Sequence, residues 1–290
     1  MYPSTIDDYQ RPSSSAEAVA AIATAGEDAH FIAGGQSLMQ AMKSRLLRPR
    51  CLIDLQDVAE LRGVQVNGGL KIGAMTRYTE LAADTSLGAA YAAINDAAAH
   101  VGDRQVRNRG TIGGSLCWNY IAACMPVVGL GLGMTMNLVS KSRGTRAVGA
   151  DTFTRSPLET ARKEDELLVS LSLPAAPKNA GSAYRKWSMM TDGLPVIGAC
   201  VYVETDGRAI RKARVAFGGL ATGPKRSPAA EHALVGCTRG DNAGIAKAMQ
   251  AAAGELEAQA DLWADASYRG HLITTLGSEM AARALDRAAG

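Results

Sequence analysis

The 290-residue chain carries 31 Lys and Arg against 28 Asp and Glu, and 47% of its residues are hydrophobic. This apolar fraction excludes a disordered chain, and a net charge of +3 without a basic run does not favour a nucleic-acid-binding protein. The N-terminus lacks the basic and apolar segments of a secretory signal, and the cysteines are scattered without a CxxC pair. Both features predict a cytoplasmic location.

The first segment predicts a small α/β unit. Ser14 followed by Glu17 is typical of a helix start, and the apolar face of that helix ends at Gly26. The elements expected next are a strand over 30–32, a helix over 37–47 that is closed by Pro49, and a strand over 51–55.

The middle of the chain predicts hairpins, helices and one long strand. These elements are hairpins over 64–72 and 134–148, an alanine-rich helix over 89–101 and a strand over 166–173. No charged side chain occurs from Gly110 to Ser140, but Pro126 and several glycines break this stretch, so a buried helix and strand are favoured over a membrane span. Within it, residues 129–133 (GLGLG) lack the third glycine of a nicotinamide fingerprint and are expected to form a buried turn.

A segment without periodic pattern over 174–181 separates a second part of the chain. The elements predicted beyond it are strands over 196–204 and 210–217 and helices over 243–260 and 278–289, which gives an α+β chain. Tyr184 and Lys186 begin a strand-like segment, where Lys186 either faces a ring system or is a solvated edge residue.

Two glycine-doublet loops are the main candidates for ligand binding. They are Ala33-Gly34-Gly35-Gln36-Ser37-Leu38 and Thr111-Ile112-Gly113-Gly114-Ser115-Leu116, each expected after a strand-like stretch and before a helix. Paired glycines allow close backbone approach, and N–H groups at a helix start suit phosphate oxygens. Two such loops predict a ligand with two phosphates, although ordinary turns use the same residues.

Other chemistry has little support in the sequence. The four histidines lie far apart without a metal-ligand spacing, and no GxSxG elbow or Cys/His arrangement suggests a nucleophile. We therefore predict no metal ligand and no catalytic side chain in this chain.

Beyond the loops, a series of ordered motifs resembles one family over essentially the whole length. The chain resembles the FAD-binding medium subunit of molybdenum hydroxylases, the group of xanthine, carbon monoxide and N-heteroaromatic dehydrogenases. The motifs are the two glycine loops, Arg48-Pro49, Leu52-Ile53-Asp54-Leu55, Ile72-Gly73-Ala74-Met75-Thr76, Val106-Arg107-Asn108-Arg109-Gly110, Glu166-Leu167-Leu168, Tyr184-Arg185-Lys186, Phe217-Gly218-Gly219 and Tyr268-Arg269.

This resemblance implies a bilobal FAD-binding fold of the vanillyl-alcohol-oxidase (PCMH) type over 1–176, with lobes of about 1–57 and 58–176. A smaller C-terminal domain of sheet and helices would occupy 177–290. The residues that it implies for FAD binding are Ile32, Ala33, Gly34, Gly35, Gln36, Ser37, Leu38, Thr76, Thr111, Ile112, Gly113, Gly114, Ser115, Cys124, Leu167, Leu168 and Lys186.

The resemblance also implies a place in a larger complex. Substrate oxidation would occur at a molybdenum–pterin centre on a large subunit, and electrons would pass through 2Fe-2S clusters of a small subunit to FAD and an external acceptor. A dimer of heterotrimers is the expected assembly. A self-sufficient flavin oxidoreductase and an assembly subunit that has lost FAD are the alternatives.

Two positions depart from the pattern of related flavoproteins. Cys124 stands where medium subunits commonly carry an acidic residue, and a thiol is a weaker hydrogen-bond partner, so a looser contact with the cofactor is expected. Gln36 stands where many flavoproteins of the wider fold have a histidine that bonds covalently to flavin, which predicts noncovalent FAD.

Overall fold

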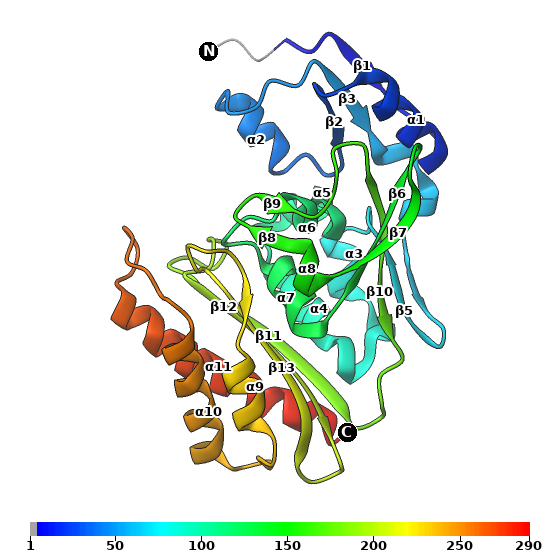
Figure 1. Ribbon diagram of the computed structural model, residues 1–290. Helices are drawn as coiled ribbons and strands as arrows, with labels where there is room; N and C mark the ends of the chain where they lie inside the picture. The colour runs from blue at the N-terminus through cyan, green and yellow to red at the C-terminus, as the bar shows by residue number, and fades with distance from the viewer. Residues whose placement is uncertain (1–4) are drawn as a thin grey trace.

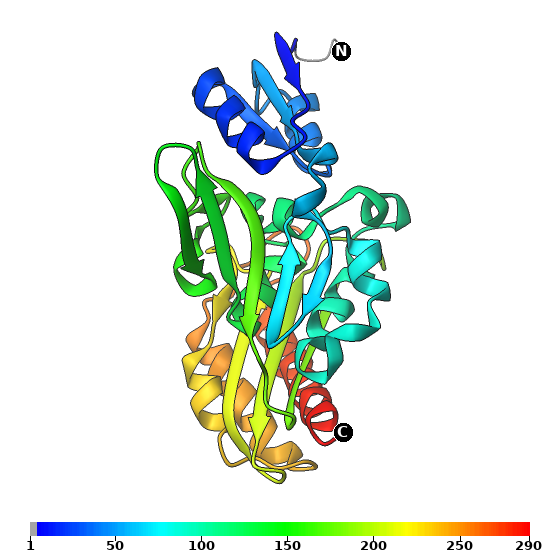
Figure 2. The ribbon, with the colours of Figure 1, turned by 90° about the vertical axis from the view of Figure 1, so that its right-hand side faces the viewer.

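The computed structural model describes residues 5–290 and consists of three parts in chain order, two lobes and a C-terminal part (Figure 1). Their main sheets have three, five and four strands. The view in Figure 2 shows the parts stacked one above another, with the first lobe at the end nearest the N-terminus. The mixture of sheets and helices confirms the predicted α+β class.

The first lobe is built on a parallel sheet in the order β1-β3-β2. Its elements are β1 (Asp8–Gln10), α1 (Ser15–Ala25), β2 (Ala29–Ile32), α2 (Leu38–Lys43), β3 (Cys51–Asp54) and the 3₁₀ turns η1 (Leu55–Asp57) and η2 (Ala59–Leu61). Because the strands are parallel, their carboxyl ends meet at one edge, and the first glycine loop leaves the sheet there. The fully buried Ile53 anchors the lobe, and burial of such a side chain contributes about 1.5–3 kcal/mol.

The second lobe contains an antiparallel sheet in the order β4-β5-β10-β6-β7 with helices packed against it. The strands are β4 (Val64–Val66), β5 (Gly69–Gly73), β6 (Thr135–Ser140), β7 (Gly144–Gly149) and β10 (Leu167–Pro174), with a small pair β8 (Thr154–Ser156) and β9 (Glu159–Thr160). The helices are α3 (Tyr78–Ala83), η3 (Thr85–Leu87), α4 (Gly88–His100), α5 (Arg104–Arg109), α6 (Ile112–Trp118), α7 (Cys124–Leu132) and α8 (Ala150–Phe153). Both predicted hairpins and the long strand are confirmed.

The C-terminal part is an antiparallel sheet in the order β11-β12-β13-β14. Its elements are β11 (Ala180–Trp187), β12 (Ile197–Thr205), β13 (Ile210–Gly218), β14 (Lys225–Arg226), α9 (Pro228–Leu234), α10 (Asn242–Glu255) and α11 (Ala266–Ala288). Helices α9, α10 and α11 cover one side of this sheet (Figure 1), and α4 and α7 of the second lobe pack against it as well. Asp96 of α4 joins the two parts by accepting hydrogen bonds from the backbone N–H of Tyr184 and from Arg287.

The structure corrects the predicted buried turn over 129–133. Residues up to Leu132 belong to α7, and Gly133 ends this helix with a left-handed φ of 68°. A Cβ on Gly131 would lie 2.5 Å from the Sγ atom of Cys200, so the glycines allow α7 to approach β12 closely. No helix within residues 5–290 is long and apolar enough to cross a membrane.

Several predicted element boundaries were wrong. The helix expected over 37–47 ends at Lys43, and the strand-like stretch expected before the second glycine loop is the helix α5. Helix α10 ends at Glu255, and α11 begins at Ala266 because the carboxylate of Asp265 caps it by accepting from the N–H of Tyr268.

Candidate functional site

The two glycine loops lie against each other at the junction between the lobes. A Cβ on Gly34 would lie 2.1 Å from the backbone oxygen of Arg109, just before the second loop. A Cβ on Gly114 would lie 3.7 Å from the Cβ of Ala33 in the first loop. The two loops are therefore in direct contact, although Gly34 and Thr111 are 77 residues apart in the sequence. The absence of a side chain at Gly34 makes this contact possible.

The first loop leaves backbone donors unused. Within residues 5–290, the N–H groups of Gly34, Gly35 and Gln36 have no hydrogen-bond acceptor, and the Gln36 side chain donates to the Gly34 oxygen at 3.1 Å. Gly35 has a φ of 73°, a backbone angle that residues with a side chain rarely adopt. Ser37 caps α2 without a side-chain hydrogen bond to it. This loop resembles an anion-binding turn, because free N–H groups precede a helix.

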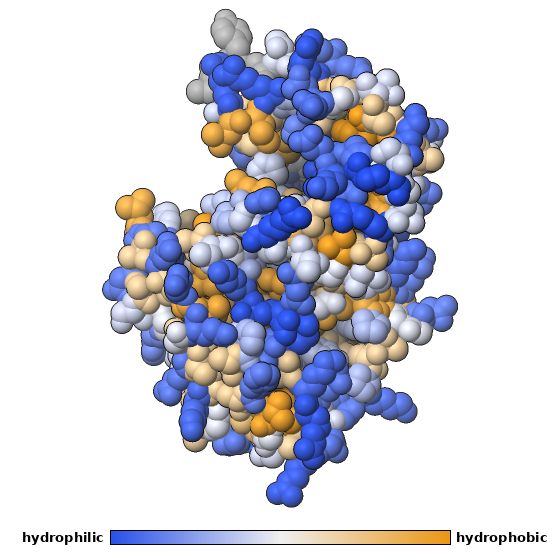
Figure 3. Space-filling model, viewed as in Figure 1, coloured by the Kyte–Doolittle hydropathy of each residue, from blue (hydrophilic) through white to orange (hydrophobic). Residues whose placement is uncertain are grey.

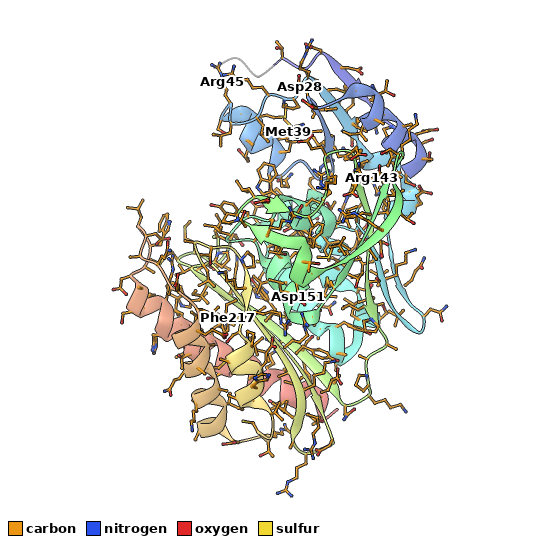
Figure 4. All side chains as sticks on the ribbon, viewed as in Figure 1. Asp28, Met39, Arg45, Arg143, Asp151 and Phe217 are labelled. Atoms are coloured by element: carbon orange, nitrogen blue, oxygen red, sulfur yellow. The ribbon has the colours of Figure 1, made fainter. Side chains whose placement is uncertain are left out.

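A cavity of about 400 Å³ opens beside the first loop. Its lining residues are Tyr9, Ile32, Ala33, Gly34, Gly35, Gln36, Met39, Gln40, Lys43, Asp54, Gln56 and Arg109. Figure 3 shows the surface recessed beneath the first lobe on the α2 side, and Met39, labelled in Figure 4, lies on α2 at this side. Five of the residues predicted for binding thus line one cavity, at the carboxyl ends of parallel strands.

Two cations line this cavity without a carboxylate partner. Neither Lys43 nor Arg109 forms an ion pair with any residue of the range 5–290. Free N–H groups and two unpaired cations together suit a ligand with two negatively charged phosphates. The cavity therefore has the donors, the charge and the room that a dinucleotide pyrophosphate needs.

The second loop uses its donors internally. The N–H groups of Ile112 and Gly113 donate to the backbone oxygens of Thr76 and Ala74, at 3.1 and 2.9 Å. The N–H of Gly114 donates to the Thr111 hydroxyl at 3.2 Å, and that of Ser115 to the Thr111 backbone oxygen at 3.2 Å. These bonds fix α6 on the segment that follows β5.

Comparison with known proteins identifies the family. Residues 4–176 match the family described as the FAD binding domain in molybdopterin dehydrogenase, and residues 182–284 match the CO dehydrogenase flavoprotein C-terminal domain. The chain belongs to this family of flavin subunits.

Relatives match it over nearly their whole length. The caffeine dehydrogenase subunit beta of Pseudomonas sp. is 31% identical over 98% of this chain and 96% of its own. The carbon monoxide dehydrogenase medium chain of Hydrogenophaga pseudoflava is 32% identical over 97% and 96%. A structure of carbon monoxide dehydrogenase from that organism superposes with a TM-score of 0.92 at 32% identity, over 99% of each chain. Quinoline 2-oxidoreductase from Pseudomonas putida 86 gives 0.91 at 29% identity, over 100% of each chain.

For a flavin subunit, FAD is the cofactor to be accommodated, and the first loop, Lys43 and Arg109 fit its pyrophosphate. The other twelve predicted residues do not line the cavity, and these include Ser37 and Leu38 at the start of α2 as well as Thr76, Leu167 and Leu168. The hydroxyl of Thr76 is buried and bonded to the backbone N–H and oxygen of Gly63, at 3.0 and 3.2 Å. Leu167 is buried in the first lobe's core and Leu168 in the second lobe's core.

Cys124 and Lys186 lie together where the second lobe packs on the C-terminal sheet. Burial raises the pKa of the Cys124 thiol, and the ammonium of Lys186 acts against this shift. Burial lowers the pKa of Lys186, which is 9% exposed and donates from Nζ to the backbone oxygen of Gly193. Lys186 is therefore not a solvated edge residue.

The Tyr184 hydroxyl completes this buried group. It has no hydrogen-bond partner within the described residues, and burial beside Cys124 and Cys200 raises its pKa. A carboxylate in place of Cys124 would give the Lys186 ammonium a partner of opposite charge. The thiol at this position supplies no such charge.

Sequence reasoning missed several cavity residues. Arg109 belongs to the arginine-rich approach to the second loop, and Lys43 lies on the helix that follows the first loop, so a search for cations near the glycines would name both as candidates, although only the fold brings them to one cavity. Tyr9, Asp54 and Gln56 come from the neighbouring strands β1 and β3 and the turn after β3, and only the parallel pairing of these strands brings them to the loop.

Proposed function

We propose that this chain binds FAD noncovalently and passes electrons from 2Fe-2S clusters on a small partner subunit to an external acceptor. Oxidation of the organic substrate would take place on a large molybdopterin subunit. The observation that carries the proposal is the first glycine loop, whose residues with unused N–H donors line the same cavity as Lys43 and Arg109. The names of the relatives, medium chain and subunit of dehydrogenases, support the division of labour.

In this proposal the chain's residues bind and orient the cofactor, which supplies the ability to accept and release one or two electrons. The N–H groups of the first loop and the two cations hold the pyrophosphate. The second loop, through Gly113 and Gly114, holds the first loop in place and lines the junction. Thr76, Leu167 and Leu168 shape the support behind the loops, and Cys124 and Lys186 lie toward the flavin end.

The assembly and location extend the proposal. We infer an FAD-binding domain over 1–176, with lobes of about 1–57 and 58–176, and a C-terminal domain over 177–290; the family matches to 4–176 and 182–284 support this division. We further infer a dimer of heterotrimers in the cytoplasm. Gln36, whose amide is bonded to the Gly34 oxygen, supports noncovalent attachment because an amide is no nucleophile toward flavin.

An absorption spectrum of the purified full chain, followed by acid release and identification of the flavin, tests the proposal. Released FAD supports noncovalent binding, and flavin that stays with the precipitated protein contradicts it. Turnover of an organic substrate by the isolated chain would indicate a self-sufficient oxidoreductase. A colourless chain within an active complex would indicate an assembly subunit that has lost FAD.

A further inference from the structure

The cavity beside the first loop is also lined by a buried carboxylate, that of Asp54. Asp54 is the last residue of β3, paired with Ile32 at the end of β2, and both line the cavity. Asp54 lies 20 residues after Gly34, across a strand–glycine loop–helix–strand unit. In nicotinamide-binding folds, an acidic residue about 20 residues after the glycine loop, on the next parallel strand, accepts hydrogen bonds from a ribose.

The contacts of Asp54 leave capacity for a ligand. The residue is 1% exposed, and its carboxylate accepts from the Tyr9 hydroxyl, from the Gln56 N–H at 2.9 Å and from the Gln56 side-chain amide at 3.0 Å. A carboxylate has about four acceptor positions, so one remains for a donor in the cavity. Because Tyr9 and Gln56 also line the cavity, they hold the carboxylate at its wall.

The charged groups that line the cavity suit different parts of a dinucleotide. Phosphates are attracted to Lys43, Arg109 and the free N–H groups and repelled by the Asp54 carboxylate. A neutral hydroxyl donor is what a buried carboxylate accepts well. The lining residues come from the first lobe and from Arg109 of α5, and Lys186 is not among them.

We propose that Asp54, held by Tyr9 and Gln56, accepts a hydrogen bond from a ribose hydroxyl group at the adenosine end of the dinucleotide. The inference rests on the proposed FAD binding and deepens it, because it assigns the half of the cofactor that the first lobe recognises. Asp54 is a binding residue for the adenosine half and takes no part in electron transfer.

The experiment uses the full chain freed of flavin, with FAD, ADP and 2′,3′-dideoxy-ADP as probes. FAD binding is followed by flavin fluorescence, and the two adenosine probes by their displacement of FAD. The wild-type chain should bind ADP about tenfold more tightly than the dideoxy analogue, because the latter leaves a buried carboxylate without its donor. This comparison needs no variant, so it does not depend on whether a variant folds.

Asp54→Asn should weaken FAD and ADP binding about tenfold and abolish the preference for ADP over its dideoxy analogue. Asp57→Asn is the matched control, since it removes the same charge three residues away, from an ion pair with Arg11. It should leave FAD affinity and the preference for ADP unchanged. Removal of negative charge near a pyrophosphate would by itself tighten binding, so the predicted weakening has the opposite sign to a purely electrostatic effect.

Three results would overturn the proposal. A wild-type chain that binds ADP and its dideoxy analogue equally has no ribose contact. An Asp54→Asn variant that keeps the preference places the contact on another residue, and tighter FAD binding by this variant makes Asp54 an electrostatic neighbour only. A wild-type chain that binds no FAD removes the proposed function itself, and this inference with it.

Discussion

In the first glycine loop, the N–H groups of Gly34, Gly35 and Gln36 have no acceptor within residues 5–290, whereas in the second loop the N–H groups of residues 112–115 all donate within the chain. Both loops nevertheless contain two successive glycines. In the first loop Gln36 and Ser37 follow the glycines, and in the second loop Ser115 follows them directly. The first leaves the carboxyl edge of a parallel sheet, and the second packs on the segment after β5.

The difference shows that a glycine doublet specifies close backbone approach but does not specify what approaches. At Gly34 the neighbour is the backbone of Arg109, and at Gly113 it is Ala74, where a Cβ would lie 2.6 Å from the Ala74 Cβ. Both glycines therefore serve packing, and only the first loop keeps its N–H groups for a ligand. We infer that the first loop binds the pyrophosphate directly while the second mainly supports it.

The largest effect is expected from Gly34→Ala. The new Cβ would lie 2.1 Å from the Arg109 oxygen, so the two loops must separate. Overpacking of this severity costs about 3 kcal/mol, which corresponds to roughly a hundredfold loss of FAD affinity when the site is distorted. Flavin content after purification and fluorescence titration would measure it. Gly254→Ala, where a Cβ meets nothing within 4 Å, is the control and should keep full flavin content.

Gly114→Val tests the second loop. Its Cβ would lie 2.9 Å from the Thr111 hydroxyl and 3.7 Å from the Ala33 Cβ, and the hydroxyl can move where a backbone cannot. We expect FAD affinity to fall about tenfold, less than for Gly34→Ala, with no change in chemistry at the molybdenum subunit. A loss equal to that of Gly34→Ala in the same titration would mean that the second loop contacts the cofactor directly, and the contrast between the loops would fail.

A crossed pair of variants sharpens the contrast further. Thr111→Val removes the side-chain cap of Gly114 and should lower the free energy of unfolding by about 1 kcal/mol with little effect on FAD affinity. Ser37→Ala removes a hydroxyl without a side-chain bond to its helix, so it should weaken FAD binding about fivefold and leave stability unchanged. Urea unfolding of the flavin-free chain and FAD titration separate the two effects. If both variants changed the free energy of unfolding and the FAD affinity in the same way, the two loops would not have different roles.

The sequence allowed prediction of those elements whose signals are local. The hairpin β4–β5 has Asn67-Gly68 at its turn, and β10 ends at Pro174, so turn residues and alternation sufficed. The prediction of a turn over 129–133 was wrong for most of α7, because glycines usually interrupt helices. In the structure, the missing side chain of Gly131 lets α7 contact Cys200 on β12, in another part of the chain.

The same limit applies to the site. The first loop could be found from its own residues, but Asp54, Lys43 and Arg109 reach the cavity only through the parallel pairing of β2 with β3 and the contact between the loops. The internal bonds of the second loop to Ala74 and Thr76 also depend on tertiary packing. Motifs therefore identify candidate ligand loops, and the fold decides which donors stay free.

The smallest effect concerns the cations on the two sides of the junction. Lys43 and Arg109 line an open cavity, whereas Lys186 is 9% exposed and its pKa is lowered by burial from the ordinary value of 10.5. Between its lowered folded-state pKa and 10.5, the unfolded chain binds more protons at Lys186 than the folded chain does. The free energy of unfolding therefore gains a contribution that rises with pH in this window, by at most about 1.4 kcal/mol per pH unit.

Lys186→Met should lose this rise, so urea unfolding at pH 7.5 and 9.5 should show a smaller gain in the free energy of unfolding for the variant than for the wild type. Cys124→Asp and Cys124→Ser provide the second arm. Both remove the titration of the buried thiol, whose raised pKa makes an opposite contribution to the slope, and only the carboxylate raises the pKa of Lys186, so Cys124→Asp should show the smaller rise of the two. Equal slopes in the wild type and Lys186→Met, together with equal slopes in the two Cys124 variants, would mean that Lys186 titrates as an exposed lysine does, and the distinction between open cations at the first loop and a buried one beyond the second would not hold.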